Sequence, residues 1–205
     1  MTYDKWKRNV SAIKKSVLNE LYVKRRKSMQ QIANELDFSL HKVAYWMEKY
    51  KISRRTRSDA MYVKNNPDGD PFKFHEPRNI EEAILFGLGL GLYWGEGTKS
   101  NPHSIRLGNT DPRLICKFIE FLIRFFEIEK NDLRFGLQIF SDIDPNHAID
   151  FWIRELAIHK NQINNPVVTK SGSLGTYHKK SQYGVLTVMY HNMKLRDAVI
   201  SKLPL

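Results

Sequence analysis

The chain has a single cysteine and no long apolar run, and each scarcity excludes a class of protein. One thiol cannot form a disulfide within the chain or a cysteine-based zinc site, and we expect Cys116, in the apolar segment 114–126, to be buried in the core. The longest uncharged apolar run, 83–95, is shorter than the ~20 residues that span a bilayer. The N-terminus lacks the apolar segment of a secretory signal, so we expect a cytoplasmic protein with no membrane partner.

Acidic residues are scarce in the first third of the chain. Residues 1–64 contain 16 Lys and Arg against 6 Asp and Glu, a net charge of +10, whereas residues 65–205 contain 17 against 16, a net charge of +1. A localised basic block is typical of proteins that bind a polyanion, with nucleic acid the first expectation and an anionic membrane the second. Charge alone leaves a merely basic surface open as the alternative.

Helical periodicity runs through residues 16–53. Three apolar stripes recur there at helical spacing, and Ser28 and Ser39 are placed to cap the second and third helices. The segment 28–60 resembles the helix-turn-helix of bacterial and phage DNA-binding proteins, with Ala33 where that motif needs a small residue. A helical bundle for protein contacts is the alternative, and the basic flanks favour DNA.

A recognition helix presents its first turns to base edges, while flanking basic residues contact phosphates. The helix-turn-helix resemblance therefore implies two sets of residues that bind double-stranded DNA. The set near the bases is Ser39, Leu40, His41, Lys42 and Tyr45, and the set near phosphates is Arg54, Arg55 and Arg57.

A linker separates this helical segment from a domain of different composition. Residues 65–79 hold three prolines and lack periodicity, which is typical of a boundary. We therefore expect a helix-turn-helix domain over 1–64 and a second domain over 80–205.

A glycine-rich helix opens the second domain. Asn79 is placed to cap a helix that runs to about residue 95, in which Gly87, Gly91 and Gly95 repeat every four residues and line one face. Glycine costs about 1 kcal/mol relative to alanine in a helix interior. A face of small residues lets two helix backbones approach closely, so this face predicts a helix–helix contact.

The end of this helix resembles a known motif. Residues 89–97, GLGLYWGEG, resemble the LAGLIDADG motif of homing endonucleases, with Gly91, Leu92, Glu96 and Gly97 at its first glycine, second leucine, final acid and final glycine. The match is partial: Gly89 replaces the first leucine, Trp94 the first aspartate and Gly95 the alanine.

The resemblance implies an α+β fold of the αββαββα type that acts as a homodimer. Two such helices pack across a two-fold axis, with Gly87, Gly91 and Gly95 at the dimer interface, and Glu96 of each chain binds Mg²⁺ over the cleavage site. The later periodicities fit this order, with one helical insertion. We expect strands in 104–110, 133–140, 166–170 and 183–190, and helices in 112–126, 145–158 (the insertion) and 192–203.

Further candidate residues follow from their places in these elements. Lys179 and Lys180, in a basic loop, could offset charge at the scissile phosphate as catalytic residues, or simply touch the DNA backbone. The residues expected to contact DNA from the second domain, or to occupy the wet face of a sheet, are Lys99, Arg106, Arg134 and Gln138. The histidines lack zinc-ligand spacing, so we expect no zinc site.

Three functions fit these patterns. The first is a Mg²⁺-dependent, site-specific DNA endonuclease of the homing type, working as a homodimer in a prokaryotic or phage setting and associated with the nucleoid. The second is a DNA-binding regulator that keeps a degenerate LAGLIDADG-like domain as a dimeric platform without catalysis. The third is an RNA-splicing maturase that uses the same platform on folded RNA.

Overall fold

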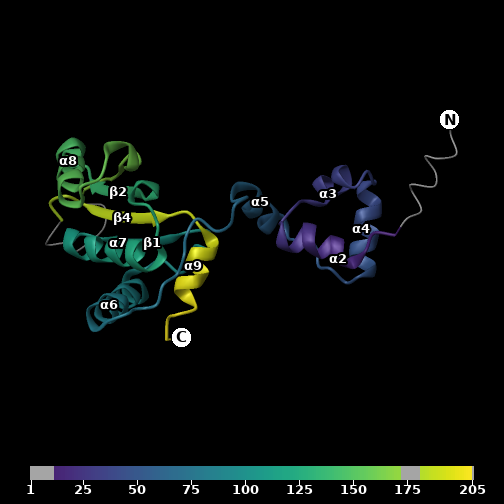
Figure 1. Ribbon diagram of the computed structural model, residues 1–205. Helices are drawn as coiled ribbons and strands as arrows, with labels where there is room; N and C mark the ends of the chain where they lie inside the picture. The colour runs from purple at the N-terminus through teal and green to yellow at the C-terminus, as the bar shows by residue number, and fades with distance from the viewer. Residues whose placement is uncertain (1–11, 172–180, 205) are drawn as a thin grey trace. The chain divides into compact units, whose positions relative to one another are not determined.

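The computed structural model describes residues 12–171 and 181–204. The chain divides into two compact units, Met1–Pro71 and Phe72–Leu205, and each has its own apolar core (Figure 1). The first unit is helical and the second combines helices with a four-stranded sheet, which confirms the predicted α+β class. Across the described ranges, no helix combines the length and the apolar character needed to cross a bilayer.

Short helices build the first unit, and their ends agree with local capping signals. Ser28 accepts a hydrogen bond from the amide of Gln31 at 3.1 Å, and the side chain of Gln31 accepts one from the amide of Ser28 at 2.8 Å. The two bonds form a capping box and confirm the predicted cap at Ser28. Ser39 accepts from the amide of Lys42 at 3.2 Å. The elements are α2 (Lys15–Leu18), the π-helix η1 (Asn19–Lys24), α3 (Met29–Glu35), α4 (Leu40–Lys49) and α5 (Arg57–Asn65).

A tight turn joins α3 to α4. Asp37 adopts a left-handed backbone conformation with φ 53°, and the amide of Phe38 donates to the carbonyl of Ala33 at 2.9 Å. Such a bond satisfies carbonyls that the helix end leaves open. Ala33 is buried, as a close approach of the two helices requires, together with Ile32, Val43 and Met47.

The second unit follows the predicted order of elements closely. Pairs of a capping acid and a proline open two of its helices, Asp111-Pro112 and Asp144-Pro145. The elements are α6 (Ile80–Glu96), β1 (Ile105–Asn109), α7 (Pro112–Phe126), η2 (Lys130–Asp132), β2 (Arg134–Phe140), α8 (Pro145–Leu156), η3 (Lys160–Gln162), β3 (Val167–Thr169), β4 (Val185–Tyr190) and α9 (Met193–Ile200).

The sheet has the strand order β1-β4-β2-β3. β4 pairs antiparallel with both β1 and β2, whereas the short edge strand β3 runs parallel to β2. Gly97, directly after α6, forms an isolated antiparallel bridge to Leu107, and the amide of Thr98 donates to the carbonyl of Arg106 at 2.9 Å. The expected strand in 104–110 is therefore present as β1, and the two residues after α6 pair with it.

One face of the sheet supports the helices α6 and α7 (Figure 1). Helix α7 supplies more of the core than any other element, with seven buried residues from Ile115 to Phe126. Helix α6 packs on α7 through Gly89, where an added Cβ would overlap the ring of Phe121. Close packing of α6 on its own unit thus requires this one glycine.

Phe72 and Phe74, in the predicted linker, pack against the core of the second unit, and the amide of Lys73 donates to the carbonyl of Phe126 at 3.1 Å. The expectation that Cys116 is buried is wrong: it is exposed on the outer side of α7. The 3.6-residue repeat turns Ile115 into the core and leaves Cys116 beside Lys117 outside. The Cys116 thiol is nevertheless partly covered, and this partial burial raises its pKa.

Candidate nucleic-acid interface

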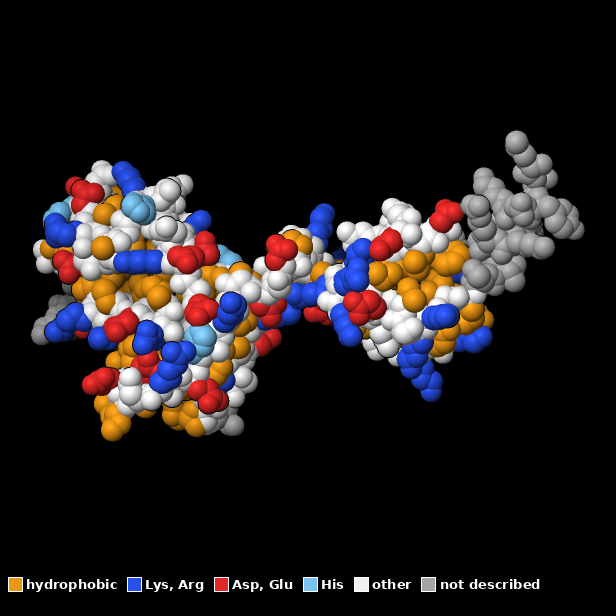
Figure 2. All heavy atoms as spheres, in the orientation of Figure 1, with side chains coloured by type: hydrophobic (Ala, Val, Ile, Leu, Met, Phe, Trp, Pro, Cys, Tyr) orange, Lys and Arg blue, Asp and Glu red, His pale blue; other side chains and the backbone are white. Residues whose placement is uncertain are grey.

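Helix α6 carries an exposed apolar face along its whole length. The side chains of Ile80 and Ile84 are 79% and 65% exposed, and Leu88 and Trp94 are also exposed. Figure 2 shows apolar side chains at the surface where α6 lies in Figure 1. The 3.6-residue repeat places these residues on one face, here called the α6 stripe. Its members are Ile80, Ala83, Ile84, Gly87, Leu88, Gly91, Trp94 and Gly95.

The three glycines of the α6 stripe have open space before them. A Cβ added to Gly87, Gly91 or Gly95 would meet no atom of the described chain within 4 Å. Packing within the described chain therefore does not require glycine at these positions, in contrast to Gly89. Because glycine destabilises a helix interior relative to alanine, three of them on an exposed apolar face favour a partner that lies outside the described residues.

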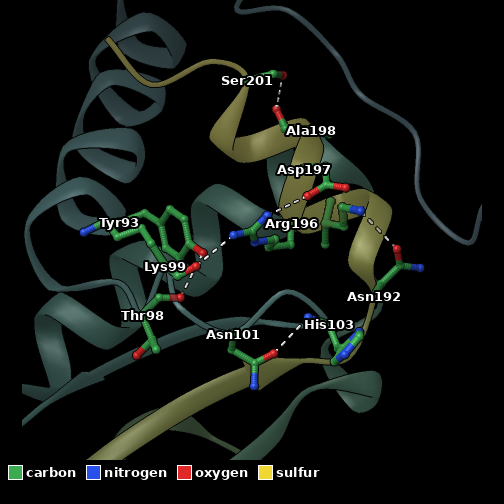
Figure 3. A network of polar contacts seen from close by, with 11 residues as sticks. Tyr93, Thr98, Lys99, Asn101, His103, Asn192, Arg196, Asp197, Ala198 and Ser201 are labelled. Atoms are coloured by element: carbon green, nitrogen blue, oxygen red, sulfur yellow. Dashed lines mark hydrogen bonds and ion pairs between the residues drawn. The ribbon is translucent and has the colours of Figure 1, made fainter. Parts of the chain in front are cut away.

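Glu96 is exposed at the last position of α6, and the turn that follows is firmly held. Arg196 of α9 donates to the carbonyl of Lys99 at 2.8 Å, and the Tyr93 hydroxyl donates to the carbonyl of Thr98 at 3.4 Å (Figure 3). Burial raises the pKa of Tyr93, so its hydroxyl keeps the proton that it donates. Lys99 Nζ bonds the carbonyl of Trp94, which places a cation at the negative end of the helix.

The sheet face opposite α7 brings two predicted residues into one row. Arg106 on β1 and Arg134 on β2 are both register partners of Met189 on β4, so the two arginines flank it. Met189 is buried but stands outside the core cluster, as expected for a side chain covered from the open face. Arg106 Nε donates to Ser104 Oγ at 2.9 Å, and Arg134 donates to the carbonyl of Asn131 at 2.8 Å.

His191 joins this row, although the sequence reasoning did not single it out. It follows β4 two residues after Met189, so the alternation of a strand places it on the same face. Burial, and then the charges of Arg106 and Arg134, lower the pKa of His191. Strand alternation from Met189 is the signal that could have found it. Here "the arginine row" denotes Arg106, Arg134 and His191.

The other residues of the second unit that were predicted to contact DNA lie in different places. Gln138 lies exposed on the same sheet face as the arginine row, and its Nε2 donates to Thr169 Oγ1 at 3.4 Å. The Lys99 ammonium is engaged at the end of α6 rather than on the sheet. Lys179 and Lys180 lie outside the described residues.

In the first unit, α4 presents most of the residues predicted to lie near the bases. Leu40, His41 and Tyr45 are exposed on it, and the side chain of Ser39 caps its start. Lys42 is half-buried, and its Nζ lies 4.0 Å from the ring centroid of Phe38.

The three arginines predicted to contact phosphates have different environments. Arg57 is exposed at the start of α5, and Arg54 is exposed 3.7 Å from Glu48. Arg55 instead stacks on Tyr22, and its guanidinium donates to the carbonyls of Tyr22 and Lys27. The backbone amide of Arg55 donates to the Tyr22 hydroxyl oxygen at 2.8 Å. These contacts tie the segment after α4 to η1.

Within the described ranges, no group of three or more His, Cys, Asp or Glu side chains could hold a metal ion. Glu96 is thus a single carboxylate on an exposed helix end, and any metal held there would need donors from outside this set. No protein-family model matches the chain, and neither a curated protein nor a solved structure shows significant similarity to it.

Proposed function

We propose that the protein is a homodimeric, Mg²⁺-dependent, site-specific DNA endonuclease of the homing type. The second unit would serve as a LAGLIDADG-like platform, and the first unit would add DNA contacts through α4. The observation that carries this proposal is the α6 stripe, an exposed apolar face that ends beside Glu96 and whose three glycines meet no other part of the described chain.

A second copy of the chain suits the α6 stripe better than solvent does. Two-fold symmetry would bring the same face together from both chains, and the glycines would let the helix backbones approach closely. Covering Ile80, Ile84 and Leu88 would also remove apolar surface from water.

The order of elements supports the proposed fold. α6, the Gly97 pairing, β1, α7, β2, β4 and α9 follow one another as in an αββαββα domain, with α8 and β3 inserted between β2 and β4. The open sheet face offers the arginine row and Gln138 for a polyanion, and arginine pairs well with phosphate.

One carboxylate per chain fits a metal site shared by two chains. Mg²⁺ is commonly held by one or two carboxylates, with waters and phosphate oxygens completing its shell. Glu96 of each chain would hold the ion, which when bound polarises a phosphate and lowers the pKa of water. The chain's own contribution is to position Glu96 through the turn held by Arg196 and Tyr93.

A non-catalytic DNA-binding regulator is the second candidate, and Trp94 is the observation that favours it. Trp94 stands where the LAGLIDADG motif has its first aspartate, and its side chain is half exposed on the α6 stripe. An aromatic ring there extends the apolar face at the expense of a carboxylate, as a domain kept for dimerisation would require.

The deciding experiment combines cleavage with oligomeric state. Purified protein is incubated with Mg²⁺ and DNA fragments from its own genomic neighbourhood, and its mass is measured by sedimentation. A dimer that cuts one fragment at a fixed position supports the endonuclease, and a dimer that binds but never cuts supports the regulator. A monomer at concentrations that saturate DNA contradicts both.

A further inference from the structure

The helix that we propose to lie against DNA, α4, exposes apolar side chains on its first turns. The side chains of Leu40 and Tyr45 are 42% and 54% exposed, one turn apart, with Ala44 beside Tyr45 and His41 beside Leu40. These four residues, here called the leading face, lie on the first turns of the helix, beside its Ser39 cap. Recognition helices contact base edges with this part of the helix.

Within the leading face, Tyr45 packs on a chain of aromatic side chains. The Tyr45 ring meets Trp46 edge-on at 5.4 Å between centroids, and Lys49 Nζ lies 4.7 Å from the centroid of Trp46. Trp46 stacks on Tyr50 at 5.4 Å, and the Tyr50 hydroxyl donates to the carbonyl of Ile13 at 2.9 Å. Little side-chain entropy is therefore left to lose when Tyr45 meets a ligand.

Few residues of α4 suit the paired hydrogen bonds by which side chains read bases, and its two lysines lie over aromatic rings. Arginine or lysine suits guanine, and asparagine or glutamine suits adenine. α4, described in full, contains no arginine, asparagine or glutamine, and Lys42 lies over Phe38 while Lys49 lies over Trp46. On α3, Gln31 is used in the capping box and Gln30 Nε2 donates to Asn34 Oδ1 at 2.8 Å.

We propose that α4 selects its DNA site mainly through thymine methyl groups, contacted by Leu40 at the start of the helix and by Ala44 and the Tyr45 ring one turn later. The thymine C5-methyl is the apolar group of the major groove, and aliphatic and aromatic side chains are its natural contacts. His41, which can donate or accept, then adds a polar contact at the same place. This inference rests on the proposed DNA-binding function of the first unit.

The test replaces every thymine by uracil, which keeps base pairing and removes only the methyl group. Full-length protein is used to select tight-binding duplexes from a random pool amplified with dTTP. The selected duplexes are then amplified with dTTP or dUTP, and the two Kd values are compared. Burying one methyl group corresponds to roughly a three- to fourfold change in Kd, so we expect at least that loss with uracil and about tenfold for two methyl groups.

Two variants assign the effect to the leading face. Leu40→Ala keeps a good helix former at an exposed position, so it should fold and should reduce the ratio of the uracil to the thymine Kd towards one. Val23→Ala truncates a comparably exposed apolar side chain on η1 and should leave the ratio unchanged. An effect of uracil on duplex shape alone would persist in the Leu40→Ala protein.

The outcomes separate this inference from the function on which it rests. Equal Kd values for thymine and uracil duplexes, or a ratio that Leu40→Ala leaves intact, overturn thymine reading by α4 while DNA binding stands. Failure of any duplex to be enriched overturns the DNA-binding proposal, and the inference with it.

Discussion

At the scale of single residues, the second unit has a carboxylate, Glu96, at the end of α6 and the arginine row on its sheet. Glu96 stands at the negative end of α6, where a carboxylate is unfavourable unless a cation is near. Lys99 lies at the same helix end through its bond to the carbonyl of Trp94. The arginine row gathers positive charge on the sheet, where a polyanion would relieve the repulsion.

Replacing Glu96 by Gln should abolish Mg²⁺-dependent cleavage while leaving the Kd for DNA in EDTA within about twofold of wild type. Glutamine keeps the size and the hydrogen bonding of the side chain and removes the charge that holds the ion. Cleavage of a plasmid target and fluorescence anisotropy measure the two quantities. Cutting that survives in the Glu96→Gln protein would remove Glu96 from the site.

His191 should make the protein less stable as the pH is lowered. Its pKa is lower in the folded protein than in the unfolded chain, so the unfolded chain binds more protons once the pH drops through its ordinary value. Stability is therefore complete above the ordinary pKa of histidine and declines as the pH falls towards the folded pKa. Between about pH 7.5 and about pH 5, the Tm of His191→Gln should fall less than that of wild type. Equal falls would mean that burial and the two arginines do not lower the pKa of His191.

At the scale of elements, α6 has two faces with opposite requirements. Its inner face needs a glycine at Gly89 because Phe121 occupies the space of a side chain. Its outer face carries glycines that the described chain does not need. Substitutions on the inner face therefore test the stability of a single chain, and substitutions on the outer face test the association of two chains.

On the inner face, Gly89→Ala should destabilise the unit by about 1–3 kcal/mol, since the new methyl group overlaps a buried aromatic ring. Urea unfolding followed by tryptophan fluorescence measures the change. The matched control is Gly87→Ala, which meets no atom within 4 Å in the described chain and should stabilise the helix itself by up to about 1 kcal/mol. A Gly89→Ala protein as stable as wild type would mean that α6 can move away from α7.

On the outer face, Gly91→Leu should convert a dimer to a monomer without unfolding the chain. The leucine has open space in a single chain, yet it would hold two helix backbones apart. Sedimentation velocity measures the oligomeric state, and circular dichroism confirms that helices are retained. If the variant still sediments as a dimer, the α6 stripe is not the contact.

At the scale of the whole molecule, charge is divided unequally between two units that each have a core. Counted at the boundary between Pro71 and Phe72, the first unit has 16 basic and 8 acidic residues, a net charge of +8, and the second has 17 and 14, a net charge of +3. We therefore expect the first unit to supply most of the phosphate contacts.

Deleting residues 1–71 should flatten the dependence of DNA affinity on salt. Each phosphate contact contributes about 0.9 to the slope of log K against log salt concentration. The remaining chain keeps Phe72 and Phe74, which pack on its core, and should stay folded. Titrations at several salt concentrations compare the two slopes, and an unchanged slope would place the contacts on the second unit.

Local patterns in the sequence predict the order and the ends of most helices correctly. The side chain of Ser39 bonds an amide three residues away, and Asp111 and Asp144 bond amides two residues away, so these caps need no distant partner. The strongly periodic helix α7 and the alternating strand β2 were readable for the same reason, because each pattern is complete within one element.

Which face of a helix or strand is covered and which is exposed depends on contacts between segments far apart in the chain. The pairing of β1 and β2 with β4 sets Arg106 and Arg134 on either side of Met189, and strands far apart in the chain determine that register. Packing on α7 separates Gly89 from Gly91, two glycines that look alike in the sequence. Likewise, the sequence does not show that the Arg55 guanidinium stacks on Tyr22 within the first unit. Local patterns indicate that a face exists, but only contacts between distant segments decide what covers it, because burial depends on the whole chain.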